Sequence, residues 1–132
     1  MICSINNKDS YSVPDEVQII GDSAFANCDR LISISLPDSV TQIGNNAFYG
    51  CENLVDVVIP DSVTNIGHGA FRFCSNLESI EIPDSVMSIG NAIVAYCSNV
   101  TITVSRDSYA AEYCKNNGLD YTYPDANEWL SD

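Results

Sequence analysis

Four cysteines at a fixed spacing are the first candidates for chemistry in this sequence. They lie 23 residues apart, at Cys28, Cys51, Cys74 and Cys97. A fixed spacing of this kind places equivalent residues above one another if the chain winds into stacked coils. Neighbouring coils would then lie about 4.8 Å apart, as strands do in a sheet. The parallel Cβ vectors of such thiols suit the torsion of a disulfide poorly. A linear file of thiols also lacks the converging ligands of a tetrahedral metal site. We predict four reduced, buried thiols, with a disulfide inside the column as the alternative, and a reactive thiol at Cys3.

A column of carboxylates repeats with the same period. Its members each follow a proline and are Asp15, Asp38, Asp61 and Asp84. Several oxygen ligands in a row could hold Ca²⁺. The other interpretation is turn formation, with each aspartate bonding its own backbone two residues on. Unit charges ~5 Å apart in water repel by only about 0.8 kcal/mol, so the column needs no metal, and we expect none.

The single histidine, His68, lies between two glycines at a position that other units fill with Asp22, Asn45 and Asn91. A catalytic histidine needs a nucleophile or an orienting carboxylate at fixed geometry, and nothing recurs near it to supply one. We predict an exposed, variable position. The sequence also lacks a phosphate-binding loop, a paired-cysteine zinc motif and a nucleophile elbow. These observations predict a protein without catalytic residues, cofactor or metal.

Composition limits the class of partner. The chain has 132 residues, 45% hydrophobic and 17% charged, and a formal net charge of −13, which indicates one globular domain. Nucleic acids and anionic membrane surfaces need a positive footprint, so neither is an expected partner. No apolar run reaches the length of about 18 residues that membrane insertion needs. The N-terminus lacks the basic and apolar regions of a signal peptide, which leaves a cytoplasmic location open.

The cysteines are positioned by a 23-residue repeat. Prolines, glycines and phenylalanines recur in register, at Pro14, Pro37, Pro60 and Pro83, at Gly21, Gly44, Gly67 and Gly90, and at Phe25, Phe48 and Phe71. A period of 20–50 residues is typical of a solenoid. We predict an N-terminal half-repeat or cap over 1–13, four repeats over 14–104, a C-terminal cap over 105–123 and a tail over 124–132. The fourth repeat has Val94 in place of phenylalanine and is one residue short.

Each unit contains two extended stretches. Alternating apolar residues over 54–59 predict a half-buried strand that ends at a proline, and 40–43 predict a second, shorter strand. Gly44 then suggests a backbone conformation closed to other residues. Phe48 and Cys51, three residues apart in the next stretch, indicate a helical turn that directs both side chains inward. The predicted coil is strand, turn, short strand and helical turn.

The C-terminal cap begins with a predicted helix. Asp107 or Ser108 can cap its N-terminus, Lys115 suits its last turn, and Gly118 ends it. One mostly apolar face would cover the open end of the last coil and consists of Ala110, Tyr113, Cys114 and Asn117. Leu119, Tyr121 and Tyr123 then alternate as a final strand. Trp129 and Leu130 fall in the acidic tail, either frayed or with one docked indole.

The repeated residues resemble the BspA-like bacterial leucine-rich repeat, Ile-Pro-x-x-Val-x-x-Ile-Gly-x-x-Ala-Phe-x-x-Cys-x-x-Leu-x-x-Ile. The resemblance covers about residues 11–123. It implies a leucine-rich repeat solenoid: a β-rich, right-handed coil with short strands, helical turns and a C-terminal capping helix. It also implies a non-catalytic binder of proteins or extracellular matrix, at the cell surface or secreted.

The outward positions of the strands are the predicted binding site. They vary between units while the inward positions hold, and they are Ser33, Ser35, Asp56, Val58, Ser79, Glu81, Thr101 and Thr103. A merely solvated face would vary in the same way. We predict a protein-interaction module with an unidentified protein partner. The first alternative is a structural spacer, or a fragment of a larger repeat array with no partner of its own, and the second, which nothing in the sequence supports, is an enzyme. The open ends of the solenoid also offer a surface for self-association.

Overall fold

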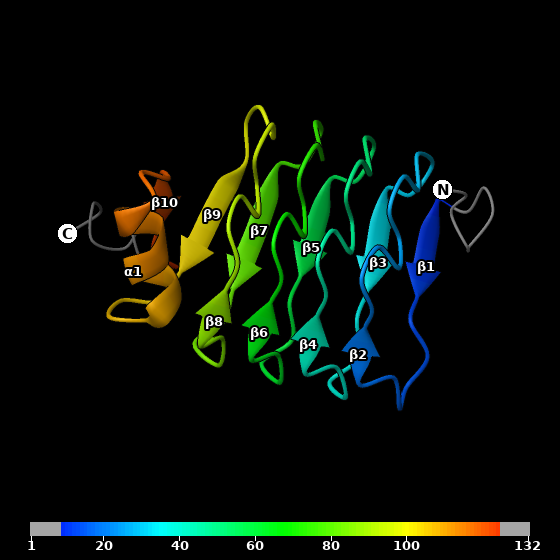
Figure 1. The fold of residues 1–132 in the computed structure, drawn as a ribbon, viewed down its shortest axis with the longest axis horizontal. Helices are drawn as coiled ribbons and strands as arrows, with labels where there is room; N and C mark the ends of the chain where they lie inside the picture. Colours follow the sequence, from blue (N-terminus) through cyan, green and yellow to red (C-terminus); the bar gives the residue numbers. More distant parts are fainter. Residues whose placement is uncertain (1–8, 125–132) are drawn as a thin grey trace.

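The chain forms a stack of coils in the computed structural model, which describes residues 9–124 (Figure 1). Two parallel sheets run along the stack. Sheet A contains, in spatial order, β1 (Ser10–Ser12), β3 (Ser33–Ser35), β5 (Asp56–Val58), β7 (Ser79–Ile82), β9 (Thr101–Val104) and β10 (Tyr121–Thr122). Sheet B contains β2 (Ile19–Ile20), β4 (Gln42–Ile43), β6 (Asn65–Ile66) and β8 (Ser88–Ile89). The predicted alternation of a longer and a shorter strand in each coil is therefore confirmed.

The register of sheet A follows the sequence repeat. Ser33 pairs with Asp56, and Asp56 pairs with Ser79, each 23 positions further on. Ser79 then pairs with Thr101, which lies one position earlier than the period would place it. The fourth coil is thus one residue shorter than the others, as the sequence spacing indicates.

The Pro-Asp-Ser segments turn the chain from sheet A toward sheet B. In each, the N–H of the following valine donates to the proline carbonyl, as between Val40 and Pro37 at 3.1 Å. Backbone atoms alone close these turns. Within residues 9–124, no backbone N–H donates to the side chains of Asp15, Asp38, Asp61 or Asp84, so the predicted side-chain bonds of these turns are absent, and all four aspartates are exposed.

The stretch after each sheet B strand is a series of turns. In the second coil, Ala47, Tyr49 and Cys51 donate their N–H groups to carbonyls three residues back. The intervening N–H groups of Asn46, Phe48 and Gly50 donate instead to carbonyls of the next coil. Alternate residues therefore make helix-like bonds, while the others join the coils and prevent a continuous helix.

The glycine column has a different cause from the one expected. Gly44, Gly67 and Gly90 do not have positive φ; a Cβ on Gly67 would lie 2.5 Å from Asn45 Oδ1 and 2.6 Å from Asn45 N. Close approach of successive coils requires glycine here, so the prediction from backbone conformation is wrong. Left-handed φ values occur two and six residues later, at Ser23, Asn27, Asn46, Gly50, Gly69, Phe73, Ala92 and Tyr96.

The core holds a stack of phenylalanine rings beside a file of thiols. Phe25 and Phe48 stack at 5.4 Å, and Phe48 and Phe71 at 5.2 Å. The Cys51 thiol donates to the Phe25 carbonyl of the preceding coil at 3.1 Å, and Cys74 and Cys97 donate in the same way. Burial raises the pKa of Cys51 to about 12, so this thiol stays protonated and unreactive.

Cys28 departs from the prediction of four free thiols, because it is disulfide-bonded. Cys51, Cys74, Cys97 and Cys114 are free, so no disulfide forms within the column. Because the other three cysteines of the column are free, the disulfide of Cys28, the first cysteine of the column, joins it to a cysteine outside the column. The predicted reactivity of Cys3 concerns a residue outside the described range.

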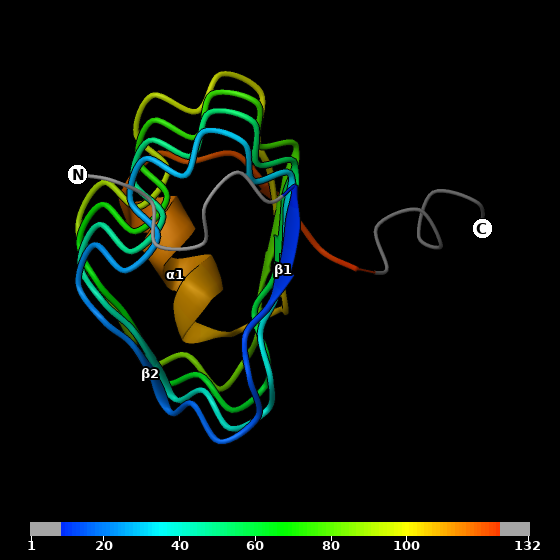
Figure 2. The ribbon, with the colours of Figure 1, turned by 90° about the vertical axis from the view of Figure 1, so that its right-hand side faces the viewer.

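A helix covers the C-terminal end of the stack, seen through the coils in Figure 2. Helix α1 (Tyr109–Asn116) is capped by Ser108, whose side chain accepts from Ala111 N–H, and Gly118 follows with φ +68°. The Tyr113 hydroxyl donates to the Gly90 carbonyl at 2.7 Å. The buried face consists of Ala110, Ala111, Tyr113 and Cys114. Asn117 is exposed, so its predicted place on that face is wrong.

The last strand, β10, pairs in parallel with β9 and extends sheet A beyond the fourth coil. This agrees with the predicted strand that precedes Pro124. Trp129 and Leu130 lie outside the described residues. No helix in residues 9–124 has the length and apolar character needed to cross a bilayer.

Candidate protein-interaction face

Two columns of outward side chains cross the strands of sheet A. The first column is joined by strand pairing and contains Ser33, Asp56, Ser79 and Thr101. The residues that follow them along the chain point into the core and are buried: Ile34, Val57, Ile80 and Ile102. Alternation along a strand therefore directs every member of this column to solvent.

The second column lies two residues further along each strand. Val58 pairs with Glu81, and Glu81 pairs with Thr103, while Ser35 holds the equivalent place in β3. Val58 is 69% exposed, an unusual position for an apolar side chain in a predominantly polar row. Of the eight predicted residues, Ser33 and Thr103 are half-buried and the other six are exposed. The fold thus brings all eight to one surface, which we call the strand face.

Sequence reasoning missed the part of this face that β1 contributes. Ser10 pairs with Ser33, and Ser12 pairs with Ser35, so both serines extend the columns by one strand. The signal was present, because residues 11–14 match residues 34–37 in pattern. At the other end, Thr122 of β10 pairs with Thr103.

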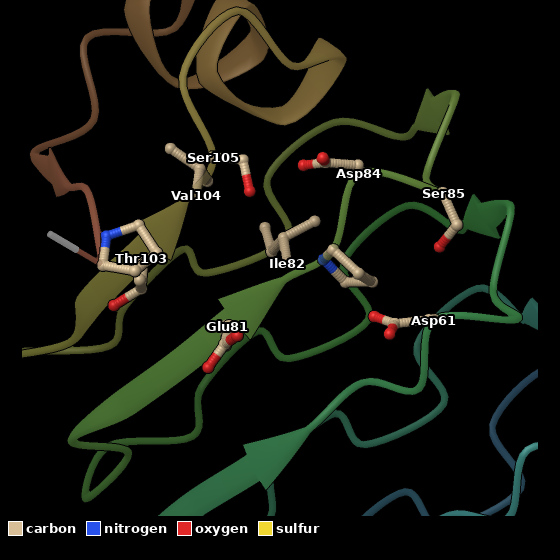
Figure 3. A pocket seen from close by; sticks show the side chains of 10 residues that line it. Asp61, Glu81, Ile82, Asp84, Ser85, Thr103, Val104 and Ser105 are labelled. Atoms are coloured by element: carbon tan, nitrogen blue, oxygen red, sulfur yellow. The ribbon is translucent and has the colours of Figure 1, made fainter.

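An acidic cavity of about 260 Å³ opens where β7 and β9 end. Three carboxylates line it, from Asp61, Glu81 and Asp84, together with the hydroxyls of Ser85, Thr103 and Ser105 (Figure 3). No cationic side chain lines it. Glu81 and Thr103 belong to both the cavity and the second column, so the cavity continues the strand face.

A second hollow, of about 500 Å³, lies where the strands begin. Its lining includes Ile32, which is 45% exposed, and Glu78. Arg30 and Asp9 also line it and approach to 4.0 Å, but both side chains are about two-thirds exposed. Exposed ion pairs of this kind contribute little to stability, so this cation is available to solvent.

The single histidine, the candidate for catalysis, has a structural role. Asp22 Oδ1 accepts from Asn45 N–H, Asn45 Oδ1 from His68 N–H, and His68 Nδ1 from Asn91 N–H, each at 2.8 Å. The repeat position that we predicted to be merely variable thus supplies a hydrogen-bond acceptor to the next coil, and these acceptors form a ladder along the stack. Asp, Asn and His side chains can all accept a hydrogen bond, and this shared property could have indicated the ladder. Within residues 9–124, no three His, Cys, Asp or Glu side chains are grouped to hold a metal ion.

The coils stack in parallel, and the apolar residues that recur every 23 positions are buried between them, which defines a repeat solenoid. A comparison with protein families identifies the type of repeat. The model of the BspA type leucine-rich repeat region matches residues 3–117 with six copies. The chain belongs to this family. No curated protein matches the sequence.

Solved structures show the same fold. A leucine-rich repeat protein from Bacteroides ovatus is 24% identical, with a TM-score of 0.74 over 87% of this chain and 36% of the other. A Treponema (T. pallidum) leucine-rich repeat protein is 23% identical, with a TM-score of 0.60 over 76% and 61%. A leucine-rich cell surface protein from Faecalibacterium prausnitzii is 24% identical, with a TM-score of 0.52 over 74% and 41%. The chain therefore spans between about a third and three-fifths of these proteins.

Proposed function

We propose that this chain is a non-catalytic protein-interaction module that binds a basic segment of a protein partner along the strand face. The observation that carries the proposal is the acidic cavity that continues this face. Leucine-rich repeat proteins commonly mediate protein interactions, and the solenoid fold is typically non-enzymatic, which supports the general class.

The charges of the strand face favour a cationic partner. Asp56 and Glu81 are its two acidic side chains, and Asp61 and Asp84 add two carboxylates at the cavity. A lysine or arginine side chain entering the cavity would meet carboxylates and hydroxyls with no competing cation in the lining. Complementary charge of this kind raises association rates and selects against acidic partners.

The dimensions of the face favour an extended segment over a globular surface. Six strands about 4.8 Å apart give a face roughly 24 Å long, and its strands are only two to four residues long. A standard protein interface covers about 800 Å² on each partner, which is more than this strip offers. A basic peptide lying across the strands would fit it, with exposed Val58 as an apolar contact.

A peptide library displayed on phage tests the proposal. We expect selected peptides to be rich in lysine and arginine, and their binding to weaken about tenfold or more in the variant Asp56→Lys with Glu81→Lys. The matched control, Asp29→Lys with Glu52→Lys, makes the same change in net charge at exposed positions outside sheet A. If both variants weaken binding equally, long-range charge alone explains it, and the strand face is not the site.

A further inference from the structure

Of the two left-handed positions in each coil, the second has an occupant that changes in size along the stack. The first two coils place Asn27 (φ 60°) and Gly50 (φ 73°) there, and the last two place Phe73 (φ 62°) and Tyr96 (φ 64°). Glycine and asparagine adopt this conformation readily, whereas bulky side chains are strained in it. Strained residues of this kind gather at functional sites, so the two aromatic residues need an explanation other than folding.

These rings lie outside the core and face solvent. Phe73 and Tyr96 stack with centroids 4.4 Å apart and planes 4° apart, and Tyr49 meets Phe73 edge-on at 5.4 Å. Phe73 is 36% exposed, and Tyr96 is 65% exposed. Tyr96 has Phe73 against one ring face, and no other ring in the described part of the chain stacks on it. We call Phe73 and Tyr96 with Arg72 the aromatic platform.

Arg72 supplies a hydrogen-bond donor to this platform. Its guanidinium carbon lies 5.3 Å from the Phe73 centroid and 5.4 Å from the Tyr96 centroid. Its Nε is buried and has no hydrogen-bond partner. A buried donor without an acceptor is unfavourable, but Arg72 as a whole is only half-buried, so a ligand beside the rings would meet the exposed part of its side chain.

The platform is the least acidic part of a strongly acidic chain. Residues 66–77 and 89–100, which carry it, contain no aspartate or glutamate, and Arg72 is their single lysine or arginine; the whole chain has a formal net charge of −13. The equivalent stretches of the first two coils contain Asp22, Asp29 and Glu52. Uncharged polar side chains follow each ring and are exposed: Ser75, Asn76, Ser98 and Asn99.

We propose that the aromatic platform binds a neutral saccharide. A cationic ligand would be repelled by Arg72 and drawn to the carboxylates elsewhere, while the net charge of the chain disfavours an anionic one. The exposed parts of the two rings amount to roughly 200 Å², since an aromatic side chain covers about 150–250 Å². That area is far below the ~800 Å² of a protein interface and matches one or two sugar rings.

The chemistry of the platform suits such a ligand. The apolar C–H face of a hexose can lie on the ring of Tyr96, which is 65% exposed, and its hydroxyls can bond the Arg72 guanidinium, whose carbon lies 5.4 Å from the Tyr96 centroid. Sites for small ligands combine apolar or aromatic walls with a few placed polar groups in this way. The turn segments that carry the platform connect β6 to β7 and β8 to β9, so this site is separate from the strand face.

Saturation-transfer NMR with maltose, cellobiose, lactose and N,N′-diacetylchitobiose tests the proposal on the full chain. The variants Phe73→Gly and Tyr96→Asn place at these positions the residue types that the first two coils use. Both types suit the left-handed backbone, so the fold should be retained. We expect at least one disaccharide to bind, and both variants and Arg72→Gln to weaken its binding about tenfold or more. Asp56→Lys with Glu81→Lys should leave saccharide binding unchanged.

Two results would overturn the proposal. One is that none of the four disaccharides binds the folded protein. The other is that a disaccharide binds equally well to the platform variants, which would place its site elsewhere. If the platform variants instead lose binding to a protein partner while no saccharide binds, the platform is a protein interface and the saccharide assignment is wrong.

Discussion

The Nδ1 atom of His68 accepts a 2.8 Å hydrogen bond from the backbone N–H of Asn91 in the next coil. The only histidine of the chain therefore continues a ladder in which aspartate and asparagine side chains bond the coil that follows. This position requires a side chain whose acceptor atom reaches the backbone N–H of the next coil. The acid–base chemistry of the imidazole ring has no part in that role.

The variant His68→Ala should be less stable than the natural protein by about 0.5–1.5 kcal/mol, the net contribution of one such hydrogen bond. His68→Asn should keep most of that stability, because Asn45 already fills the equivalent role one coil earlier. Urea unfolding measures both. Equal losses in the two variants would show that the imidazole ring itself, and not its acceptor atom, stabilises the coil.

Much of this fold could be predicted from the sequence, but the ladder of side-chain acceptors between the coils was not predicted. The recurrence of Phe48, Cys51 and their equivalents indicated the core because burial constrains residue type. Residues that bond between coils, such as Asp22 and His68, share an acceptor atom but not a size or a charge, so they looked variable. The columns of the strand face were predictable from alternation alone. The cavity beside Glu81 was not, because it depends on how two turns lie relative to the strand ends.

Gly67→Ala should destabilise the protein by roughly 1–3 kcal/mol or more, because the new Cβ would lie within 2.7 Å of backbone atoms of the preceding coil and overpacking carries costs of that size. Gly21→Ala is the matched control, since a Cβ there meets nothing within 4 Å. That variant should be neutral or slightly stabilised. Comparable losses at both sites in thermal unfolding would contradict the role assigned to close approach.

Cysteine labelling distinguishes the disulfide-bonded residue from the buried thiols. If the protein is denatured without reductant and alkylated, we expect modification at Cys51, Cys74, Cys97 and Cys114 and none at Cys28. Peptide mass spectrometry assigns the sites. Alkylation of Cys28 under these conditions would refute its disulfide.

The free core thiols should make the fold sensitive to alkaline pH. Burial raises the pKa of Cys51 from 9.0 to about 12, and it also raises the pKa of Cys74 and Cys97. Above pH 9 the unfolded chain therefore loses thiol protons that the folded chain retains, so stability falls as pH rises toward 12. Each thiol contributes up to about 1.4 kcal/mol per pH unit in this range. Urea midpoints at pH 7.5 and 10.5 should differ less in Cys51→Ala than in the natural protein.

The phenylalanine stack gives the largest expected effect on stability. Phe48 is fully buried and stacks on Phe25 and Phe71 at once, so Phe48→Ala removes both ring contacts and leaves a cavity in a central coil. Such truncations cost about 3–5 kcal/mol, a large part of the ~5–15 kcal/mol that stabilises a domain. Phe48→Leu fills more of the space and should lose clearly less. Because Val94 already ends the stack in the fourth coil, Phe71→Val should be milder than Phe48→Ala. A melting temperature for Phe48→Ala within a few degrees of the natural value would mean that the rings do not hold the coils together.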